Sequence, residues 1–420
     1  MCHGAAAART VVPADGRDGD TGAMDVDAPG DGTLPGSALA GVGQRPFGVY
    51  VHVPFCATRC GYCDFNTYTA GELGTSASPQ SWLAGLRAEL TLAAQVLGAP
   101  GADTVFVGGG TPSLLGADGL ADVLAAVRDT FGLAPGAEVT TESNPESTSP
   151  AFFAGIREAG YTRVSLGMQS AAAHVLRTLD RTHTPGRAVA AAQEARAAGF
   201  DHVNLDLIYG TPGETDADLD ASLAAVLEAG VDHVSAYALI VEDGTAMARK
   251  VRRGELPMPD DDVLASRYER LDAGLAAAGL DWYEVSNWSR PGAECRHNVG
   301  YWNGGDWWGA GPGAHSHVGG VRWWNVKHPA RYAEVLARGE SPAAAREVLG
   351  DADVHTERVM LTARLRSGLD PADLGPDELV VARQRVADGL LVEVGGRLAL
   401  TPRGRLLADA VVRDVLVAGD

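Results

Sequence analysis

The chain has 420 residues, 45% of them hydrophobic, which is enough for one large domain and one small domain with ample core. A net charge of −20 argues against a general binder of phosphate backbones and against a polybasic membrane anchor, so we expect no nucleic acid partner. No apolar run approaches the roughly 18 to 20 residues of a membrane span, and no basic segment precedes an apolar core at the N-terminus. We therefore expect a cytoplasmic protein of enzyme size without a transmembrane segment.

The first 45 residues differ in composition from the rest of the chain. They combine six aspartates with glycine, alanine and proline, and they contain almost no large apolar side chains. Such a segment cannot bury enough apolar surface to offset the entropy lost on ordering. We predict an acidic, disordered tail over residues 1–45; the alternative is a segment that folds on a partner.

Alternating strand and helix signals begin at Phe47. The run Val49, Val51 and Val53 predicts the first strand. Five further strands are predicted at 103–107, 138–142, 162–167, 202–208 and 232–239, separated by helical stretches such as 120–130 and 187–198. Six β–α units predict an α/β protein with a parallel sheet curled into a partial (β/α)6, TIM-like barrel over residues 46–280.

Three of the five cysteines, Cys56, Cys60 and Cys63, follow the first strand at spacings of four and three positions. Such a loop turns three soft thiolates toward one centre, and thiolates favour iron–sulfur clusters or zinc. A [4Fe-4S] cluster normally takes four cysteines, so three leave one iron open to a substrate or cofactor. The alternatives are a disulfide and a structural zinc site, for which His52 and Asp64 are the poor additional ligands nearby.

Other polar and glycine-rich motifs also follow predicted strands. The sequence GGGTP at 108–112 follows the second strand, ESNP at 142–145 ends the third, Gln169 follows the fourth and Asp206 lies near the end of the fifth. Loops at the carboxyl ends of barrel strands build the active site, so we expect these motifs to meet the cysteine loop at one mouth. The glycine N–H groups could then hold the charged end of a ligand. The alternatives are a tight packing turn for the glycines and ordinary surface positions for the polar residues.

The CxxxCxxC motif after a strand, with an aromatic residue before its third cysteine, resembles the radical S-adenosylmethionine (SAM) superfamily. The resemblance implies that the amino and carboxylate groups of SAM chelate the open iron. It also implies an electron donor for the cluster and cleavage of a sulfur–carbon bond to give a 5′-deoxyadenosyl radical. The protein then supplies position and the exclusion of water.

The full series of motifs is YVHVPFCxxxCxxC, GGGTP, ESNP, LGMQS, LDRTH at 179–183 and DLIYGTPGET. From about Phe47 to near the C-terminus, this series resembles the oxygen-independent coproporphyrinogen III oxidase family and its relatives. The resemblance implies that the cluster ligands are Cys56, Cys60 and Cys63. It implies SAM contacts at eight residues, Tyr50, Gly109, Gly110, Thr111, Glu142, Gln169, Arg181 and Asp206.

One departure from that family bears on function. The oxidases carry a further cysteine two residues after the third ligand, where this chain has Phe65. The substitution resembles the HemW-type heme chaperones, and the run 297–302 matches their HNxxYW element. This resemblance implies a protein that binds heme and passes it to apo-hemoproteins, with respiratory enzymes as recipients. The alternative functions are radical oxidative decarboxylation of coproporphyrinogen propionates and a SAM-independent scaffold that holds structural zinc.

Residues 281–350 have an unusual aromatic content. Seven of the eight tryptophans fall between 282 and 324, together with His297, His315 and His317. Flat aromatic faces stack on porphyrins, and a neutral imidazole can take an axial iron position. We predict a heme-associated segment that packs on the barrel, with His297 as the candidate heme ligand. The alternative is a packed aromatic cover that closes the open side of the barrel.

Residues 351–420 show a third pattern. Helical stretches at 357–365 and 377–389 precede a hairpin at 390–401 with two glycines at its turn, and a last helix begins near Pro402. This order predicts a small winged-helix-like α+β domain. From 354 to 420 nine basic residues face ten acidic ones, so the basic footprint of a DNA reader is absent. We interpret the domain as a structural or partner-docking cap; a homodimer and peripheral contact with a membrane during heme delivery are compatible with it.

Overall fold

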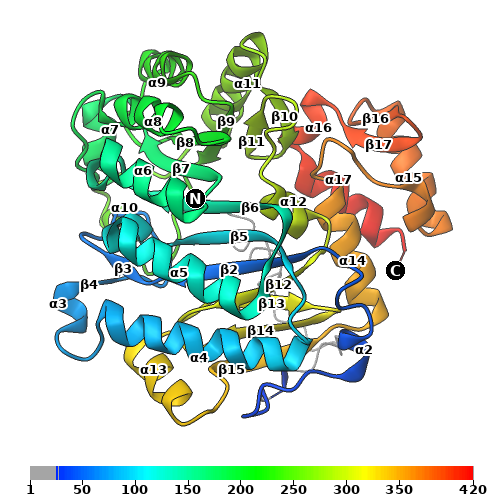
Figure 1. The fold of residues 1–420 in the computed structure, drawn as a ribbon. Helices are drawn as coiled ribbons and strands as arrows, with labels where there is room; N and C mark the ends of the chain where they lie inside the picture. Colours follow the sequence, from blue (N-terminus) through cyan, green and yellow to red (C-terminus); the bar gives the residue numbers. More distant parts are fainter. Residues whose placement is uncertain (1–24, 27, 420) are drawn as a thin grey trace.

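The computed structural model describes residues 25, 26 and 28–419 (Figure 1). At its centre six parallel strands lie side by side in the order β2-β5-β6-β7-β8-β9. Each of the six strands predicted for the barrel overlaps one of them. Their bounds are Phe47–Val53, Ala102–Gly109, Leu133–Ser143, Arg163–Gln169, His202–Tyr209 and His233–Ala238.

Helices connect these strands and flank the sheet (Figure 1). In α5 the buried residues Leu120, Val123, Leu124 and Val127 recur at helical spacing, which is why this segment forms an amphipathic helix against the strands. The helices of this part of the chain are α3 Ala70–Leu73, α4 Pro79–Leu97, α5 Gly116–Phe131, α6 Pro150–Ala159, α7 Ala173–Thr178, α8 Arg187–Ala197, α9 Asp216–Ala229, α10 Ala246–Arg252 and α11 Asp261–Ala277.

The segment 281–350 lengthens the sheet at both edges. On one side β12 pairs in parallel with β2, and β13, β14, β15 and β1 continue antiparallel; on the other side β11 and β10 follow β9. The added elements are β1 Asp25–Val26, β10 Asp281–Glu284, β11 Asn287–Ser289, α12 Arg296–Trp302, β12 Asp306–Ala310, β13 His315–Val318, β14 Val321–Asn325, α13 Pro329–Ala337 and β15 Ala343–Val348.

The tryptophans of this segment serve mainly in packing. Trp308 and Trp323 are buried and meet edge to face with ring centroids 4.9 Å apart. Trp288 is buried beside Tyr268, with centroids 5.5 Å apart. These contacts agree with the alternative of an aromatic packing layer, because rings buried against one another have no face left for a porphyrin.

The expected disordered tail is described in part. Residues 1–24 and 27 lie outside the described residues, whereas residues 28–45 pack against the extended sheet. Gly30 accepts a hydrogen bond from the Ser341 N–H at 2.7 Å, Ala38 in α2 (Gly36–Leu39) is fully buried, and Arg45 pairs with Asp306 at 2.7 Å. Residues 28–45 are therefore ordered, which differs from the expected disorder. The reason is that β12 to β15 offer a packing surface, and the composition of the tail alone gives no information about such a distant surface.

The C-terminal elements follow the predicted order and build a hydrophobic core of their own. The Arg405 guanidinium joins them to the barrel, since it contacts both Asp272 carboxylate oxygens at 2.7 and 2.6 Å and lies 4.7 Å from the Trp282 ring centroid. None of the helices among the described residues combines the length and the apolar character needed to cross a membrane. The elements are α14 Asp351–Thr362, α15 Pro376–Ala387, β16 Leu391–Val394, β17 Arg397–Leu400, α16 Pro402–Leu406 and α17 Ala408–Val417.

Candidate functional site

The cysteine loop leaves the carboxyl end of β2 and is held by backbone contacts. Two short parallel strands frame it, β3 (Phe55–Cys56) and β4 (Tyr68–Thr69). In its middle the Gly61 N–H donates to the Leu179 carbonyl at 3.2 Å, and the Gly61 carbonyl accepts from the Met247 N–H at 2.7 Å. A Cβ on Gly61 would lie 2.3 Å from the Asp180 carboxylate, so only glycine fits this close approach.

Side-chain hydrogen-bond donors face two of the three thiols, and the Phe65 backbone faces the third, Cys63. Thr111 Oγ1 lies 3.8 Å from Cys56 Sγ, and Arg181 Nη1 lies 3.3 Å from Cys60 Sγ. Burial raises the pKa of Cys56 and raises the pKa of Cys63 to about 12, so these two thiols are neutral when free and release protons when they bind metal. The guanidinium and the hydroxyl fit a negatively charged thiolate cluster.

The structure also bears on the kind of metal site. Among residues 25, 26 and 28–419, no three side chains of His, Cys, Asp or Glu are grouped closely enough to hold a single metal ion.

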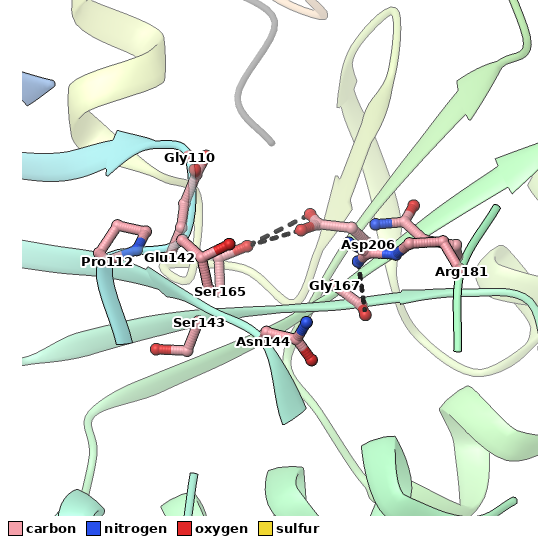
Figure 2. Close-up of a pocket in the computed structure, with 11 residues that line it drawn as sticks. Gly110, Pro112, Glu142, Ser143, Asn144, Ser165, Gly167, Arg181 and Asp206 are labelled. Carbon is pink, nitrogen blue, oxygen red and sulfur yellow. Dashed lines mark hydrogen bonds between the residues drawn. The ribbon is translucent and has the colours of Figure 1, made fainter. Parts of the chain in front are cut away.

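A small pocket lies beside this loop at the carboxyl ends of the strands (Figure 2). Six of the eight predicted SAM contacts line it together, Gly110, Thr111, Glu142, Gln169, Arg181 and Asp206. Gly109, a seventh, adjoins it and donates its N–H to Glu142 at 3.2 Å. A Cβ on Gly110 would lie 2.4 Å from the Phe55 carbonyl oxygen, so the absence of a side chain lets the segment after β5 pass this close to the cysteine loop.

Five further residues line the pocket besides the implied SAM contacts, Pro112, Ser143, Asn144, Ser165 and Gly167. Four of the five belong to motifs that the prediction already used, GGGTP, ESNP and LGMQS, so the signal was present in the sequence. Ser165 lies just before the last of these motifs, and only its inward direction on β7 identifies it.

The pocket has polar atoms that fit a polar ligand. Within the described part of the chain, the buried atoms Gln169 Nε2, Arg181 Nε and Ser143 Oγ have no hydrogen-bond partner. Buried polar groups are costly without partners, so a ligand with acceptor and donor groups would stabilise them. The neighbouring Tyr62 and Cys60 groups outweigh the effect of burial and raise the pKa of Arg181, which therefore stays a cation.

Tyr50 lies in the barrel but does not appear among the residues that line this pocket. Its ring stacks on Phe106 with centroids 6.3 Å apart, and its hydroxyl lies 3.0 Å from His52 Nδ1. Tyr50 therefore stands one residue away from Gly109, because the His52 ring that it bonds lies against Gly109.

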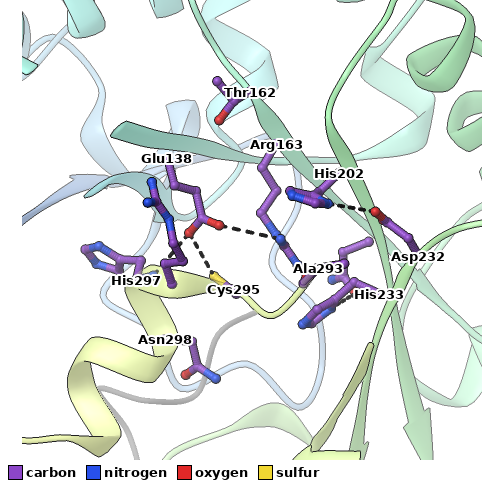
Figure 3. A network of polar contacts seen from close by, with 12 residues as sticks. Glu138, Thr162, Arg163, His202, Asp232, His233, Ala293, Cys295, His297 and Asn298 are labelled. Atoms are coloured by element: carbon purple, nitrogen blue, oxygen red, sulfur yellow. Dashed lines mark hydrogen bonds and ion pairs between the residues drawn. The ribbon is translucent and has the colours of Figure 1, made fainter. Parts of the chain in front are cut away.

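His297 lies at the opposite end of the strands, near their amino ends (Figure 3). Its Nδ1 is 2.8 Å from Thr104 Oγ1 and its Nε2 is 2.7 Å from the Tyr301 hydroxyl. The side chain is only 3% exposed, and burial lowers the pKa of His297 to about 3. An axial bond from either ring nitrogen to heme iron would require one of these hydrogen bonds to break, so the structure does not place His297 as a ready heme ligand.

Buried polar contacts hold the segment around His297 against the barrel floor (Figure 3). Glu138 and Arg163 form a buried ion pair at 3.5 Å, and Arg163 Nη2 donates to the Ala293 carbonyl at 2.8 Å. The His297 N–H donates to Glu138 at 3.1 Å, and Cys295 Sγ lies 3.6 Å from the same oxygen. Sequence reasoning missed these contacts because they join Glu138 and Arg163 to residues 293–297, which lie 130 or more positions away in the chain.

A second, larger pocket of about 1320 Å³ lies between the barrel mouth and the C-terminal domain. It exceeds the roughly 300–1,000 Å³ of common small-molecule sites. Cys63 and Phe65 lie on one wall and Arg364, Arg403 and Arg405 on another. Apolar and aromatic side chains line much of the remainder, including Ile208, Leu239, Ile240, Trp302, Met360 and Leu407.

Comparison with known proteins places this geometry in a family. A family model described as the radical SAM superfamily matches residues 50–226. The chain is 67% identical over 383 residues to the heme chaperone HemW of Mycobacterium tuberculosis (strain ATCC 25618 / H37Rv), which covers 91% of this chain and 97% of that protein. It is 30% identical over 373 residues to the heme chaperone HemW of Bacillus subtilis (strain 168), which covers 86% and 97%.

A solved structure supports the fold. Coproporphyrinogen III oxidase (HemN) from Escherichia coli, described as a radical SAM enzyme, superposes with a TM-score of 0.77 over 91% of this chain and 92% of that one. At 24% identity this likeness concerns the fold alone. The relatives matched over nearly their whole length carry the family assignment, and the chain belongs to the HemW family of heme chaperones within the radical SAM superfamily.

Proposed function

We propose that this chain binds heme and transfers it to apo-hemoproteins, with the help of a [4Fe-4S] cluster and SAM. Membership of the radical SAM superfamily implies the cluster and SAM. The single observation that supports the heme function best is the high identity to proteins named heme chaperone over 91% of the chain. Phe65, which stands where the oxidases have a further cysteine and which lines the large pocket, agrees with it.

The cysteine loop would hold the cluster through Cys56, Cys60 and Cys63, and the small pocket would hold SAM. A reduced cluster with SAM supplies cleavage of a sulfur–carbon bond. The chain's own groups orient the ligand: Arg181 offers a cation next to Cys60, and Glu142 and Asp206 offer carboxylates for amine and hydroxyl groups. The remaining predicted contacts, Tyr50, Gly109, Gly110, Thr111 and Gln169, stay proposals of the same kind.

Heme would occupy the large pocket. Its apolar and aromatic walls suit a flat porphyrin, and its arginines suit propionate carboxylates. Arg364 is paired with Asp409 at 2.5 Å and Arg405 with Asp272 at 2.6 Å. Within residues 28–419 the Arg403 guanidinium donates one long hydrogen bond, to the Asp388 carbonyl at 3.4 Å, so it is the one best placed to accept a propionate.

The HNxxYW element would then contribute through its other members. Asn298 and Trp302 line the large pocket, and Trp302 Nε1 is a buried donor without a partner among the described residues. His297 would hold α12 against β5 through its hydrogen bond to Thr104. A heme-ligand role for His297 remains the competing proposal, and it requires α12 to leave its place.

The partners are proposals that follow from this function. Recipients would be apo-hemoproteins, with respiratory enzymes expected. An electron donor would reduce the cluster. A cytoplasmic location, peripheral contact with a membrane during delivery and a homodimer are expected on the same grounds.

An anaerobic heme titration paired with an iron and sulfide count tests the proposal. We expect stoichiometric heme binding, about four irons and four sulfides per chain, and no protoporphyrinogen from coproporphyrinogen with reduced cluster and SAM. Protoporphyrinogen would favour the oxidase function instead. Zinc without iron would favour the scaffold, and an intact cluster without heme binding would refute the chaperone function.

Two variants locate the heme. Trp302→Leu should weaken heme binding about tenfold, whereas His297→Gln, which keeps a hydrogen-bonding side chain, should leave it within about twofold. The reverse order of effects would support His297 as the ligand. The Soret band of bound heme provides the readout in both variants.

A further inference from the structure

A chain of buried hydrogen bonds runs from the small pocket into the barrel floor. It begins at Asp206, whose carboxylate accepts from Asn204 Nδ2 at 2.7 Å and from Ser165 Oγ at 3.1 Å. Asn204 Oδ1 lies 2.7 Å from His233 Nδ1, and His233 Nε2 lies 2.9 Å from the Tyr283 hydroxyl. All five side chains are buried, so water does not compete for these bonds.

The chemistry of the chain settles which way Asn204 points. Its amide nitrogen faces a carboxylate and two hydroxyls, Ser165 at 2.7 Å and Ser235 at 3.1 Å. Exchanging the amide oxygen and nitrogen would place an oxygen 2.7 Å from an Asp206 carboxylate oxygen, so that two hydrogen-bond acceptors would face each other. The amide oxygen therefore faces His233.

This orientation determines the tautomer of His233. Because Asn204 Oδ1 accepts only, His233 Nδ1 carries the proton, and Nε2 is left as an acceptor for the Tyr283 hydroxyl. If Nε2 also carried a proton, the ring would be a cation and Nε2 could no longer accept the hydrogen bond of the Tyr283 hydroxyl. Arg163 and His202 lie near this ring, and burial together with the charge of Arg163 lowers the pKa of His233.

We propose that His233 is a positioning residue for the SAM pocket, since its neutral Nδ1–H tautomer fixes the Asn204 carboxamide and, through it, the Asp206 carboxylate. The inference rests on the proposed binding of SAM at this pocket. His233 does not touch the ligand itself, because it does not line the pocket and two side chains, Asn204 and Asp206, stand between. Its effect is to stop the Asp206 carboxylate from rotating away from the ligand.

The other end of the chain reaches toward the large pocket. Asn298 Nδ2 lies 3.4 Å from the Tyr283 hydroxyl and 3.2 Å from Glu284 Oε1, and both Asn298 and Glu284 line that pocket. The α12 helix therefore sits at one end of the series of contacts and the SAM pocket at the other. This placement gives the Asn298 position of the HNxxYW element a structural link to Asp206.

Anaerobic calorimetric titration of SAM into cluster-loaded protein tests the proposal. His233→Phe removes both hydrogen bonds and should weaken SAM binding about tenfold, the cost of misplacing one hydrogen bond to a charged group. His233→Gln, which offers an amide donor and an acceptor, should restore most of the affinity. Tyr283→Phe, which is isosteric and expected to fold, should cause a smaller loss of about fivefold or less.

His202→Gln is the matched control. His202 is a half-buried histidine at the start of β8 that bonds Asp232 at 2.7 Å and takes no part in the chain to Asp206, so its replacement should leave SAM affinity unchanged. Nitrogen-15 spectra of the histidine rings give a readout independent of SAM. We expect His233 to show a neutral ring with its proton on Nδ1 throughout the pH range in which the protein stays folded.

The outcomes separate the inference from the proposed function. If the unaltered protein binds its cluster but no SAM, the proposed SAM site fails. If it binds SAM while folded His233→Phe and Tyr283→Phe bind equally well, the site stands and the positioning role is wrong. A His233 ring with its proton on Nε2, or one that titrates within this pH range, would also overturn the inference.

Discussion

At the scale of single residues, close packing around Gly61 limits which side chains the cysteine loop can carry at this position. Gly61 hydrogen-bonds the backbone of two different segments, at Leu179 and at Met247, while Asp180 occupies the space that a side chain would need. Asp180 is itself held by Lys250 at 2.9 Å, so it cannot easily yield. The LDRTH motif thus supports the loop as well as supplying Arg181.

Gly61→Ala should displace the loop and lower cluster content. The added Cβ would lie 2.3 Å from the Asp180 carboxylate, and the loop must shift to relieve the clash. We expect at least about half of the iron and sulfide to be lost after anaerobic reconstitution, with a cost of about 1–3 kcal/mol in unfolding free energy. Gly71→Ala, where nothing lies within 4 Å of the new Cβ, is the control and should retain a full cluster.

At the scale of elements, a single buried carboxyl ties the sheet extension to α4. Glu89 accepts from Asn325 at 2.7 Å, from the Gly311 N–H at 2.8 Å and from Trp308 Nε1 at 3.3 Å, and the Tyr332 hydroxyl also bonds it. Burial outweighs these donors and raises the pKa of Glu89 to about 7. The strands from 306 to 348 therefore depend on a group that titrates near neutral pH.

Glu89 should make stability depend on pH in a defined direction. Between its usual pKa of 4.5 and about 7, the folded protein keeps a proton that the unfolded chain has lost. This contribution is fully present below pH 4.5 and is lost as pH rises through about 7, on the order of 3 kcal/mol in total. Thermal unfolding at about pH 5 and about pH 8 should show a larger loss of stability in the unaltered protein than in Glu89→Gln.

The comparison with Glu89→Gln isolates this group. Burial also raises the pKa of Glu284 to about 7, but Glu284 is present in both proteins and cancels in the difference. Equal pH dependence in the two proteins would show that the four donors keep Glu89 ionised throughout.

The buried ion pair of Glu138 and Arg163, which holds the start of α12 against the barrel, is a second element-scale contact that can be tested. Arg163 and Glu138 are 1% and 5% exposed, so removal of one charge leaves the other buried and unpaired. Arg163→Met should cost about 3–5 kcal/mol in unfolding free energy, whereas the double variant Arg163→Met with Glu138→Leu should recover part of this loss. A loss of less than about 1 kcal/mol for the single variant would mean that water reaches the pair.

At the scale of the whole molecule, the large pocket depends on how the C-terminal domain sits on the barrel. Arg405 is 7% exposed, bonds Asp272 of α11 through two nitrogens and lies over Trp282, which packs against both hydrophobic cores. Arg405→Ala should cost about 3 kcal/mol and should separate the unfolding of the C-terminal domain from that of the barrel. Hydrogen exchange would then rise in residues 351–419 before it rises in the barrel strands.

Arg403→Ala provides the control for domain docking, because Arg403 is an exposed neighbour with one long contact to a backbone carbonyl. It should leave hydrogen exchange unchanged while it weakens heme binding if Arg403 accepts a propionate. Equal exchange in Arg405→Ala and the unaltered protein would contradict the docking contact.

Much of this molecule follows from the sequence by itself. The six barrel strands, the cysteine loop and six of the eight predicted pocket residues rest on short motifs and on periodic side chains, which act within a few positions along the chain. The same holds for the hairpin with Gly395 and Gly396 at its turn. Local signals of this kind can be recognised in the sequence without knowledge of which distant segments pair with one another.

Only the tertiary structure decided the rest, because long-range pairing has no local signature. The parallel pairing of β12 with β2, the packing of residues 28–45 and the hydrogen bonds that occupy both nitrogens of His297 join segments up to about 300 positions apart. Histidine and tryptophan suit a heme ligand and a packed core equally well, and burial among specific neighbours is what separates the two. The sequence alone therefore identified the residues of the HNxxYW element, and the fold determined which of them face a pocket.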